Sequence, residues 1–181
     1  FFIGSDYLDL VLDLGGTNSC IDSFELCIVD SYVNSNIIRV PQDYEAIQDA
    51  VDAANDNDIV LIGPGLYTVQ ETIIVDKPIK ITSEYLNSSN EADIDVTIIT
   101  GPTNLDPLLL FTEAANGSEC TGLTFKGARK QVTLECEFMK VTYCKFFDNS
   151  SDALNIEAAG GYFAYNYFEN NGDEAIDADD S

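Results

Sequence analysis

Short runs in which apolar and polar residues alternate fill most of this chain. Two of them lie near its start, YLDLVLDLG at residues 7–15 and FELCIVD at residues 24–30. A period of two is typical of a strand with one buried face, and the GGTNSC segment between the runs has turn composition. We therefore predict a β segment over residues 1–35 and leave its place relative to the rest of the chain open.

The apolar spacing changes once, between residues 40 and 58. In VPQDYEAIQDAVDAANDND the residues Ile47, Ala50, Val51 and Ala54 recur at the spacing of one helix face. The sequence predicts a helix over about 43–54, with Asp43 capping its first turn. A buried strand at Ile59–Ile62 and a Gly-Pro-Gly turn follow. Beyond them we expect only short strands and turns, with no second helix.

The later strands repeat. The segment VTYCKFFDNSSDALNI (141–156) matches FAYNYFENNGDEAIDA (163–178) at an offset of 22, and CTGLTF (120–125) matches VTYCKF at an offset of 21. The alignment pairs Val141 with Phe163, Phe146 with Phe168, Asn149 with Asn171, Ala153 with Ala175, Leu154 with Ile176, Asn155 with Asp177, Cys120 with Val141 and Phe125 with Phe146. Coils of about 21–22 residues predict an all-β solenoid, in which each coil stacks on the last. The predicted helix would cover the N-terminal end of the stack, where open strand edges invite aggregation.

The charge balance is strongly acidic. The chain has 32 acidic and 8 basic residues, a formal net charge of −24, and no histidine. Such a charge excludes binding to a phosphate backbone, so nucleic acid is not an expected partner. The acidic excess either keeps a secreted, salt-adapted protein hydrated or binds divalent cations in part. No apolar run reaches the roughly 20 residues of a membrane span, and the only methionine, Met139, shows that Phe1 is not an initiator residue.

Five cysteines do not form a metal pattern. Without histidine they match no zinc site, and Ser-His-Asp or Cys-His chemistry is excluded as well. Cys20 and Cys27 could pair in an oxidising compartment. Cys120 and Cys144 fall where apolar residues recur, and we predict that they are buried thiols.

A known family shares these features. The segment VPQDYEAIQDAVDAANDNDIVLIGPGLYTVQETIIVDKPIKITSE (40–84) resembles the N-terminal cap and first coils of the pectin-lyase-like superfamily, and FENNGDEAIDADDS (168–181) resembles its repeats. The resemblance covers about residues 36–181 and implies a right-handed parallel β-helix with an N-terminal capping α-helix. It also implies that further coils follow Ser181. The superfamily includes lyases, esterases, hydrolases and surface proteins, so the resemblance implies the fold more than the activity.

Acidic residues suggest a metal site. Asp173, Glu174, Asp177 and Asp179 lie one predicted coil beyond Asp152. Calcium takes six to eight oxygen ligands from flexible carboxylates and amides, so calcium is the candidate cofactor. DEAID (173–177) also resembles the D-G-A-x-D element of pectate lyases, with Glu174 in place of the glycine. The alternative is a solvated acidic turn.

Outward-facing residues on the same coils suggest a surface for sugars. Tyr143, Tyr165 and Tyr167 alternate with inward residues and would form a row suited to stacking on sugar rings, with Lys145 beside Tyr167. The same row could instead be packed by a neighbouring subunit or loop. The one basic cluster, KGARK at 126–130, either holds a polyanionic sugar chain or offsets the acid around it.

Three functional hypotheses follow. The first is an extracellular or cell-surface β-helix that binds acidic or neutral polysaccharide or other copies of itself. The second is a calcium-dependent polysaccharide lyase or hydrolase, although the chain has no complete catalytic motif. The third is a structural solenoid subunit of a filament or surface layer.

Overall fold

The computed structural model describes residues 2–3, 6–7, 35–158 and 160–178. The chain divides into two units, Phe1–Tyr32 and Val33–Ser181. In the first unit, β1 (Phe2–Ile3) pairs with β2 (Asp6–Tyr7) in antiparallel fashion. The predicted strands over residues 8–14 and 24–30, and the cysteines Cys20 and Cys27, lie outside the described residues. The predicted domain boundary stays a prediction.

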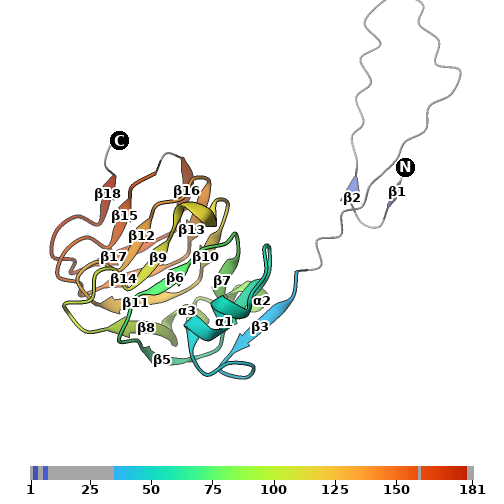
Figure 1. The fold of residues 1–181 in the computed structure, drawn as a ribbon, viewed down its shortest axis with the longest axis horizontal. Helices are drawn as coiled ribbons and strands as arrows, with labels where there is room; N and C mark the ends of the chain where they lie inside the picture. The colour runs from blue at the N-terminus through green and yellow to red at the C-terminus, as the bar shows by residue number, and fades with distance from the viewer. Residues whose placement is uncertain (1, 4–5, 8–34, 159, 179–181) are drawn as a thin grey trace, which may run out of the picture. The chain divides into compact units, whose positions relative to one another are not determined.

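The second unit is a right-handed parallel β-helix with three parallel sheets (Figure 1). Sheet 1 contains β3 (Ile37–Val40), β4 (Ile59–Ile62), β7 (Lys80–Ser83), β10 (Glu119–Thr121), β13 (Met139–Thr142) and β16 (Gly161–Ala164). Sheet 2 contains β5 (Gly65–Thr68), β8 (Thr97–Gly101), β11 (Thr124–Gly127), β14 (Lys145–Phe147) and β17 (Tyr167–Glu169). Sheet 3 contains β6 (Ile73–Val75), β9 (Leu109–Phe111), β12 (Val132–Leu134), β15 (Leu154–Ile156) and β18 (Ile176–Ala178).

The register confirms the predicted repeat. Five coils each contribute one strand to every sheet, the last two being β13–β14–β15 and β16–β17–β18. The pairings expected within strands are all present: Val141 with Phe163, Phe146 with Phe168, Leu154 with Ile176, Asn155 with Asp177, Cys120 with Val141 and Phe125 with Phe146. Because each coil pairs its backbone with the next, like residues stack into ladders.

The predicted cap is a short helix. Helix α1 spans Ile47–Ala53 and contacts β3, β4 and β6 near the N-terminal end of the stack (Figure 1). Its buried residues are Ile47, Ala50 and Val51, as the spacing predicted. The prediction that Asp43 caps the helix was wrong: the N-cap is Ala46, without a side-chain hydrogen bond. The Asp43 carboxylate instead accepts a hydrogen bond from the backbone N–H of Arg39 at 2.7 Å, which fixes the turn before the helix.

The prediction of no second helix was also wrong. Helices α2 (Tyr85–Ser88) and α3 (Glu91–Asp95) lie between β7 and β8, and a 3₁₀ turn spans Glu113–Ala115. The insertion lengthens the second coil, so that 39 residues separate the paired Ile81 and Cys120, against 21 for Cys120 and Val141. Among the described residues, no helix is long and apolar enough to cross a membrane.

Ladders of apolar side chains fill the interior. Fully buried examples are Val60, Ile81, Cys120 and Val141 in sheet 1, Ile99, Phe125 and Phe146 in sheet 2, and Leu109, Val132 and Leu154 in sheet 3. Each such side chain contributes about 1.5–3 kcal/mol when buried. Cys120 and Cys144 are buried free thiols, as predicted, with their sulfurs 3.9 Å apart. The hydrogen bond to Cys144, together with burial, raises the pKa of the Cys120 thiol.

Candidate functional site

A groove on the outer face of sheet 2 contains all four residues predicted to bind substrate. We call it the tyrosine groove; its volume is about 440 Å³. Its lining consists of Glu91, Ile94, Tyr143, Lys145, Phe147, Tyr165, Asn166 and Tyr167. A larger cleft of about 580 Å³ lies between α1 and the β5–β6 region, but it contains none of the predicted site residues. The tyrosine groove is therefore the better candidate.

One wall of the groove comes from the inserted helices. Asn90 caps α3 by accepting a hydrogen bond from the Ala92 N–H at 3.1 Å, and Ile94 is the buried residue of that helix. The Thr124 hydroxyl of β11 donates to the Ile94 carbonyl at 2.8 Å, which fastens α3 against sheet 2. The wall thus stands beside the strands that hold Lys145 and Tyr167.

Two tight turns between sheets 1 and 2 present the tyrosines. Tyr143 and Tyr165 have left-handed backbones, with φ of 55° and 60°, a conformation that is uncommon for residues other than glycine. The side chain of Asn166 joins the two turns, because it accepts from the Cys144 N–H at 2.9 Å and donates to the Val141 carbonyl at 2.8 Å. Both tyrosines are therefore held outward from a fixed backbone.

The same turn one coil earlier contains Gly122, with φ of 69°. A Cβ atom on Gly122 would lie 2.8 Å from the Cβ of Tyr85, so only glycine leaves room for this tyrosine of α2. Tyr85 then lies against Tyr143 with ring centroids 5.0 Å apart, and Tyr143 stacks on Tyr165 at 4.7 Å and 10°. We call these three rings the tyrosine column. Burial, and then the neighbouring Tyr143, raises the pKa of Tyr85.

Lys145 and Tyr167 face outward and pair across β14 and β17, as predicted. The Lys145 ammonium forms an ion pair with Asp95 at the end of α3, which links the floor of the groove to its wall. The Tyr167 hydroxyl donates to the Glu169 carboxylate at 2.8 Å, and this hydrogen bond and the Glu169 charge raise the pKa of Tyr167. Polar groups thus flank the exposed rings.

A second hollow continues along the outer face of sheet 2 from Phe147. Its volume is about 260 Å³, and its lining includes Lys126, Asp148, Glu169 and Asn170. Lys126 pairs with Asp148 at 3.2 Å. The other two basic residues of the KGARK cluster also pair, Arg129 with Asp106 and Lys130 with Asp152 at 3.5 Å. The interpretation that this cluster offsets surrounding acid is confirmed.

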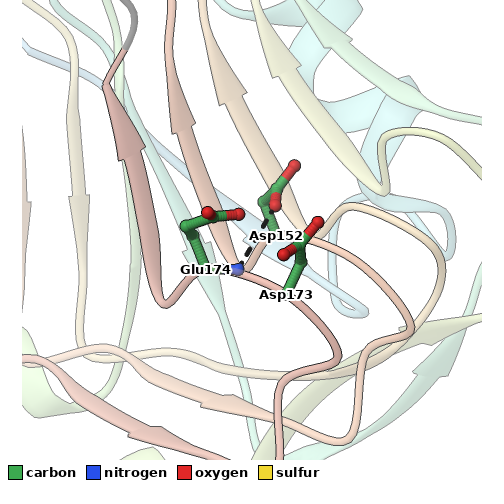
Figure 2. A group of neighbouring side chains, drawn as sticks. All are labelled: Asp152, Asp173 and Glu174. Atoms are coloured by element: carbon green, nitrogen blue, oxygen red, sulfur yellow. Dashed lines mark hydrogen bonds between the residues drawn. The ribbon is translucent and has the colours of Figure 1, made fainter.

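Three of the predicted metal ligands come together where the last two coils approach sheet 3. Asp152 precedes β15, and Asp173 and Glu174 precede β18 (Figure 2). Their carboxylate oxygens lie within 4.8 Å of one another; we call them the carboxylate cluster. The Glu174 N–H donates to Asp152 at 3.4 Å, as the dashed line in Figure 2 shows. Asp152 is 5% exposed, whereas Asp173 and Glu174 face solvent.

The other two predicted ligands do not join this cluster. Asp177 lies within β18 opposite Asn155, and its carboxylate is not among those that lie within 4.8 Å of one another. Asp179 lies outside the described residues. Three carboxylates supply only part of the six to eight oxygens that calcium takes, and Lys130 already faces Asp152. A cation here would be held by Asp173 and Glu174, with Asp152 behind them and water as the remaining ligands.

The carboxylates influence one another. A hydrogen bond that protonated Glu174 donates to the Asp173 carboxylate, and then the Asp173 charge, raise the pKa of Glu174 above its usual value. Two carboxyl groups in one site favour a shared proton. The neighbouring carboxylate therefore favours the protonated form of Glu174, and a carboxyl group that holds a proton is what general acid catalysis needs.

Sequence reasoning missed the residues that build the groove wall. Tyr85, Glu91 and Asp95 belong to the unpredicted helices α2 and α3. One pattern could have indicated α3, because Asn90 is a favoured N-cap and Glu91 and Asp93 follow in the first turn. Asn166 was also missed, since its role depends on two neighbouring coils.

The fold and its outer groove define the class: a right-handed parallel β-helix with an aromatic surface on its last coils. Among solved structures, the chain is similar to the catalytic domain of a GH87 alpha-1,3-glucanase in complex with nigerose, with a TM-score of 0.52 and 14% identity over 80% of this chain. A complex of that domain with tetrasaccharides matches equally, with a TM-score of 0.52 and 14% identity over 80% of this chain. The chain spans 31% of the length of the glucanase domains it matches. Likeness at this identity shows the fold.

The glucanase structures also include three single aspartate-to-alanine variants. Two of the substituted positions are consecutive, and the third lies 23 positions before the first of them. No family model and no curated protein sequence matches the chain.

Proposed function

We propose that this protein is an extracellular β-helix that binds a polysaccharide in the tyrosine groove. The observation behind the proposal is that Tyr143, Lys145, Tyr165 and Tyr167, all predicted from sequence, line one open groove with a separate wall. Association with other copies of the chain, as in a filament or surface layer, stays a prediction.

Exposed ring faces supply the apolar part of the site. Tyr165, the third ring of the tyrosine column, is 70% exposed, and Tyr167 is 51% exposed. A flat aromatic face packs against the C–H face of a sugar ring and desolvates it with little loss of side-chain entropy. Glu91 and Glu169 would accept hydrogen bonds from sugar hydroxyls, and Lys145 would donate them.

The left-handed tyrosines support the same proposal. Gly122 shows that this turn accepts glycine at no steric cost, yet the last two coils have tyrosine there. A residue with a side chain pays roughly 1–2 kcal/mol for this conformation. Stacking within the tyrosine column offsets only part of that cost, about 0.5–1.5 kcal/mol per aromatic pair. Left-handed non-glycine residues also occur outside the groove, for example Ala128 and Phe138, so this strain supports the proposal only together with the exposure of the rings.

The structural likeness is consistent with this function. The glucanase domain was solved with nigerose and with tetrasaccharides, so the same fold holds saccharides in that protein. For this chain, at 13–14% identity, a polysaccharide ligand is a proposal whose support comes from the groove itself.

The test is binding to a panel of polysaccharides, measured by affinity electrophoresis and calorimetry on the whole chain. Tyr165→Ala is expected to weaken binding about tenfold, the equivalent of one aromatic contact. The matched control is Tyr162→Ala, because Tyr162 is 55% exposed but lies on β16 in sheet 1. Equal losses in both variants, or no binding to any polymer, would contradict the proposal.

A second candidate function is hydrolysis at the carboxylate cluster. The observation in its favour is one buried carboxylate, Asp152, placed one coil before the consecutive pair Asp173 and Glu174. The three substituted aspartates of the glucanase have the same order along their chain, a single position followed by a pair. Glu174, with its raised pKa, would donate a proton to the glycosidic oxygen, and a carboxylate partner would attack the anomeric carbon as nucleophile. The carboxylate oxygens lie within 4.8 Å of one another, which fits the short separation of retaining glycosidases; water would then release the glycosyl-enzyme intermediate.

Calcium binding by the same carboxylates is the competing proposal, and one assay separates the two. Release of reducing ends from polysaccharides, with and without a chelator, measures hydrolysis, and absorbance from unsaturated ends measures lyase activity. Glu174→Gln should lower hydrolysis by at least about 100-fold if Glu174 is the acid, with Asp56→Asn, a change to an exposed carboxylate far along the chain, as the control. A melting temperature that falls with chelator in the parent chain, but not in Glu174→Gln, would assign the cluster to calcium.

A further inference from the structure

The groove and its surroundings also indicate the charge of the ligand. The lysines near the groove are already paired: Lys145 at the floor of the groove pairs with Asp95, and Lys126 in the adjoining hollow pairs with Asp148 at 3.2 Å. Neither ammonium is left to face a ligand alone. A sugar carboxylate would have to displace a protein carboxylate before it could use either lysine.

Acidic side chains outnumber these lysines. The lining of the tyrosine groove and the adjoining hollow contains four acidic residues and two lysines: Glu91, Asp95, Asp148 and Glu169, and Lys126 and Lys145. The potential over this surface is therefore negative, and it adds to the field of a chain with a formal net charge of −24. A polyanion would be repelled before contact, whereas an uncharged polymer would not.

In the rest of the β-helix, too, most basic side chains are paired with carboxylates. Seven of the eight basic side chains of the chain form ion pairs with carboxylates: Lys77, Lys80, Lys126, Arg129, Lys130, Lys140 and Lys145. A surface that recognises sugar acids needs cations free to form charge-assisted or bidentate contacts. Here those cations are already paired with carboxylates of the chain itself.

We propose that the tyrosine groove selects a neutral polysaccharide and rejects polyuronates. This inference rests on the proposed glycan-binding function and adds the substrate class to it. Ring faces at Tyr165 and Tyr167 would pack on uncharged sugars, and the carboxylates of Glu91 and Glu169 would accept hydrogen bonds from their hydroxyls.

The experiment compares each polyuronate with its carboxyl-reduced, uncharged counterpart, together with neutral glucans, in the presence of chelator. Binding to the whole chain and to Tyr165→Ala is measured by affinity electrophoresis. We expect a neutral polymer to bind, to lose about tenfold in affinity in Tyr165→Ala, and to bind at least about tenfold more tightly than its charged counterpart.

A charge variant provides a gain-of-function arm. Asp95→Asn leaves Lys145 without its carboxylate partner, so polyuronate affinity should rise several-fold at low salt and the rise should vanish at high salt. The control, Asp106→Asn, releases Arg129 outside the groove and should leave polyuronate affinity unchanged.

The outcomes separate this inference from the function on which it rests. A polyuronate that binds as tightly as its reduced form, with or without calcium, and that loses affinity in Tyr165→Ala would overturn the neutral-ligand inference and keep the groove as the site. Absence of binding to every polymer, or binding indifferent to Tyr165→Ala, would overturn the proposed function and this inference together.

Discussion

The β-helix contains two aromatic columns with nearly the same spacing and opposite exposure. Inside, Phe125, Phe146 and Phe168 form a phenylalanine column with centroids 5.3 and 4.9 Å apart. Outside, the tyrosine column has spacings of 5.0 and 4.7 Å. The coil rise sets the spacing of the phenylalanines and of Tyr143 and Tyr165, since each of these rings stacks on the ring one coil away. Tyr85 instead comes from the inserted helix α2 and lies against Tyr143 at 39°.

The difference lies in what the remaining surface of each ring contacts. Phe125 and Phe146 are fully buried, whereas Tyr165 is 70% exposed. Inside, the rings exclude water and stabilise the fold. Outside, the rings of the tyrosine column cover one another in part and border the tyrosine groove. One repeat thus supplies stability inside the coils and, in our proposal, a binding surface outside them.

The largest loss of stability is expected from a substitution in the phenylalanine column. Phe146→Ala should lower the free energy of unfolding by about 3–5 kcal/mol, because it leaves a cavity between two stacked rings. Urea unfolding measures the loss. Phe147→Ala, at the next position on β14 and partly exposed on the outer face, is the control and should cost less than about 1.5 kcal/mol. Equal losses of unfolding free energy in Phe146→Ala and Phe147→Ala would show that the inner and outer faces of β14 contribute equally to stability.

A smaller effect tests how the tyrosine column is built. Gly122→Ala adds a Cβ atom 2.8 Å from the Tyr85 Cβ at a backbone φ of 69°. Gly117→Ala is the matched control, because it has a φ of 81° and nothing within 4 Å of the added atom. Both variants lose about 1–2 kcal/mol to the left-handed backbone, and Gly122→Ala should lose about 1–3 kcal/mol more through overpacking. Identical urea midpoints for Gly122→Ala and Gly117→Ala would show that the position of Tyr85 does not depend on the absence of a side chain at Gly122.

The interior could be predicted because it repeats. Phe125, Phe146 and Phe168 recur at intervals of 21 and 22 residues, and stacked coils require like residues at like positions. The same argument correctly placed Lys145 opposite Tyr167, since a strand that buries one neighbour must expose the next.

The groove wall could not be predicted in this way, because it interrupts the repeat. Helices α2 and α3 have four and five residues, and Ile94 is their only buried residue, so neither helix has an apolar stripe. The contact between Lys145 and Asp95 joins residues 50 positions apart, a separation unrelated to the coil length. The carboxylate cluster was partly predictable, because coil stacking unites Asp152 with Asp173 and Glu174, but Asp177, within β18, does not join them.

A third column consists of charged side chains, and we expect its disruption to change the free energy of unfolding least. On the outer face of sheet 1, Glu119 lies between Lys80 and Lys140 of the neighbouring coils, with ion-pair distances of 2.7 and 2.8 Å. Glu119→Gln removes both ion pairs at a partly exposed site, so the free energy of unfolding at pH 7 should fall by only about 1 kcal/mol. Asp148→Asn, which removes one more exposed pair with Lys126, is the control and should change it by less than about 0.5 kcal/mol.

The pH dependence of that effect identifies its cause. Burial alone would raise the pKa of Glu119, but hydrogen bonds from Lys140 and Lys80 outweigh burial and lower it below its usual 4.5. A lowered pKa in the folded state gives stability that is present above pH 4.5 and lost as the pH falls through the folded value. Urea unfolding of the parent chain and of Glu119→Gln should therefore differ by a constant amount from pH 7 to about 5 and converge below 4.5. A difference that persists at pH 3 would mean that Glu119 acts through packing, as the phenylalanine column does, and not through charge.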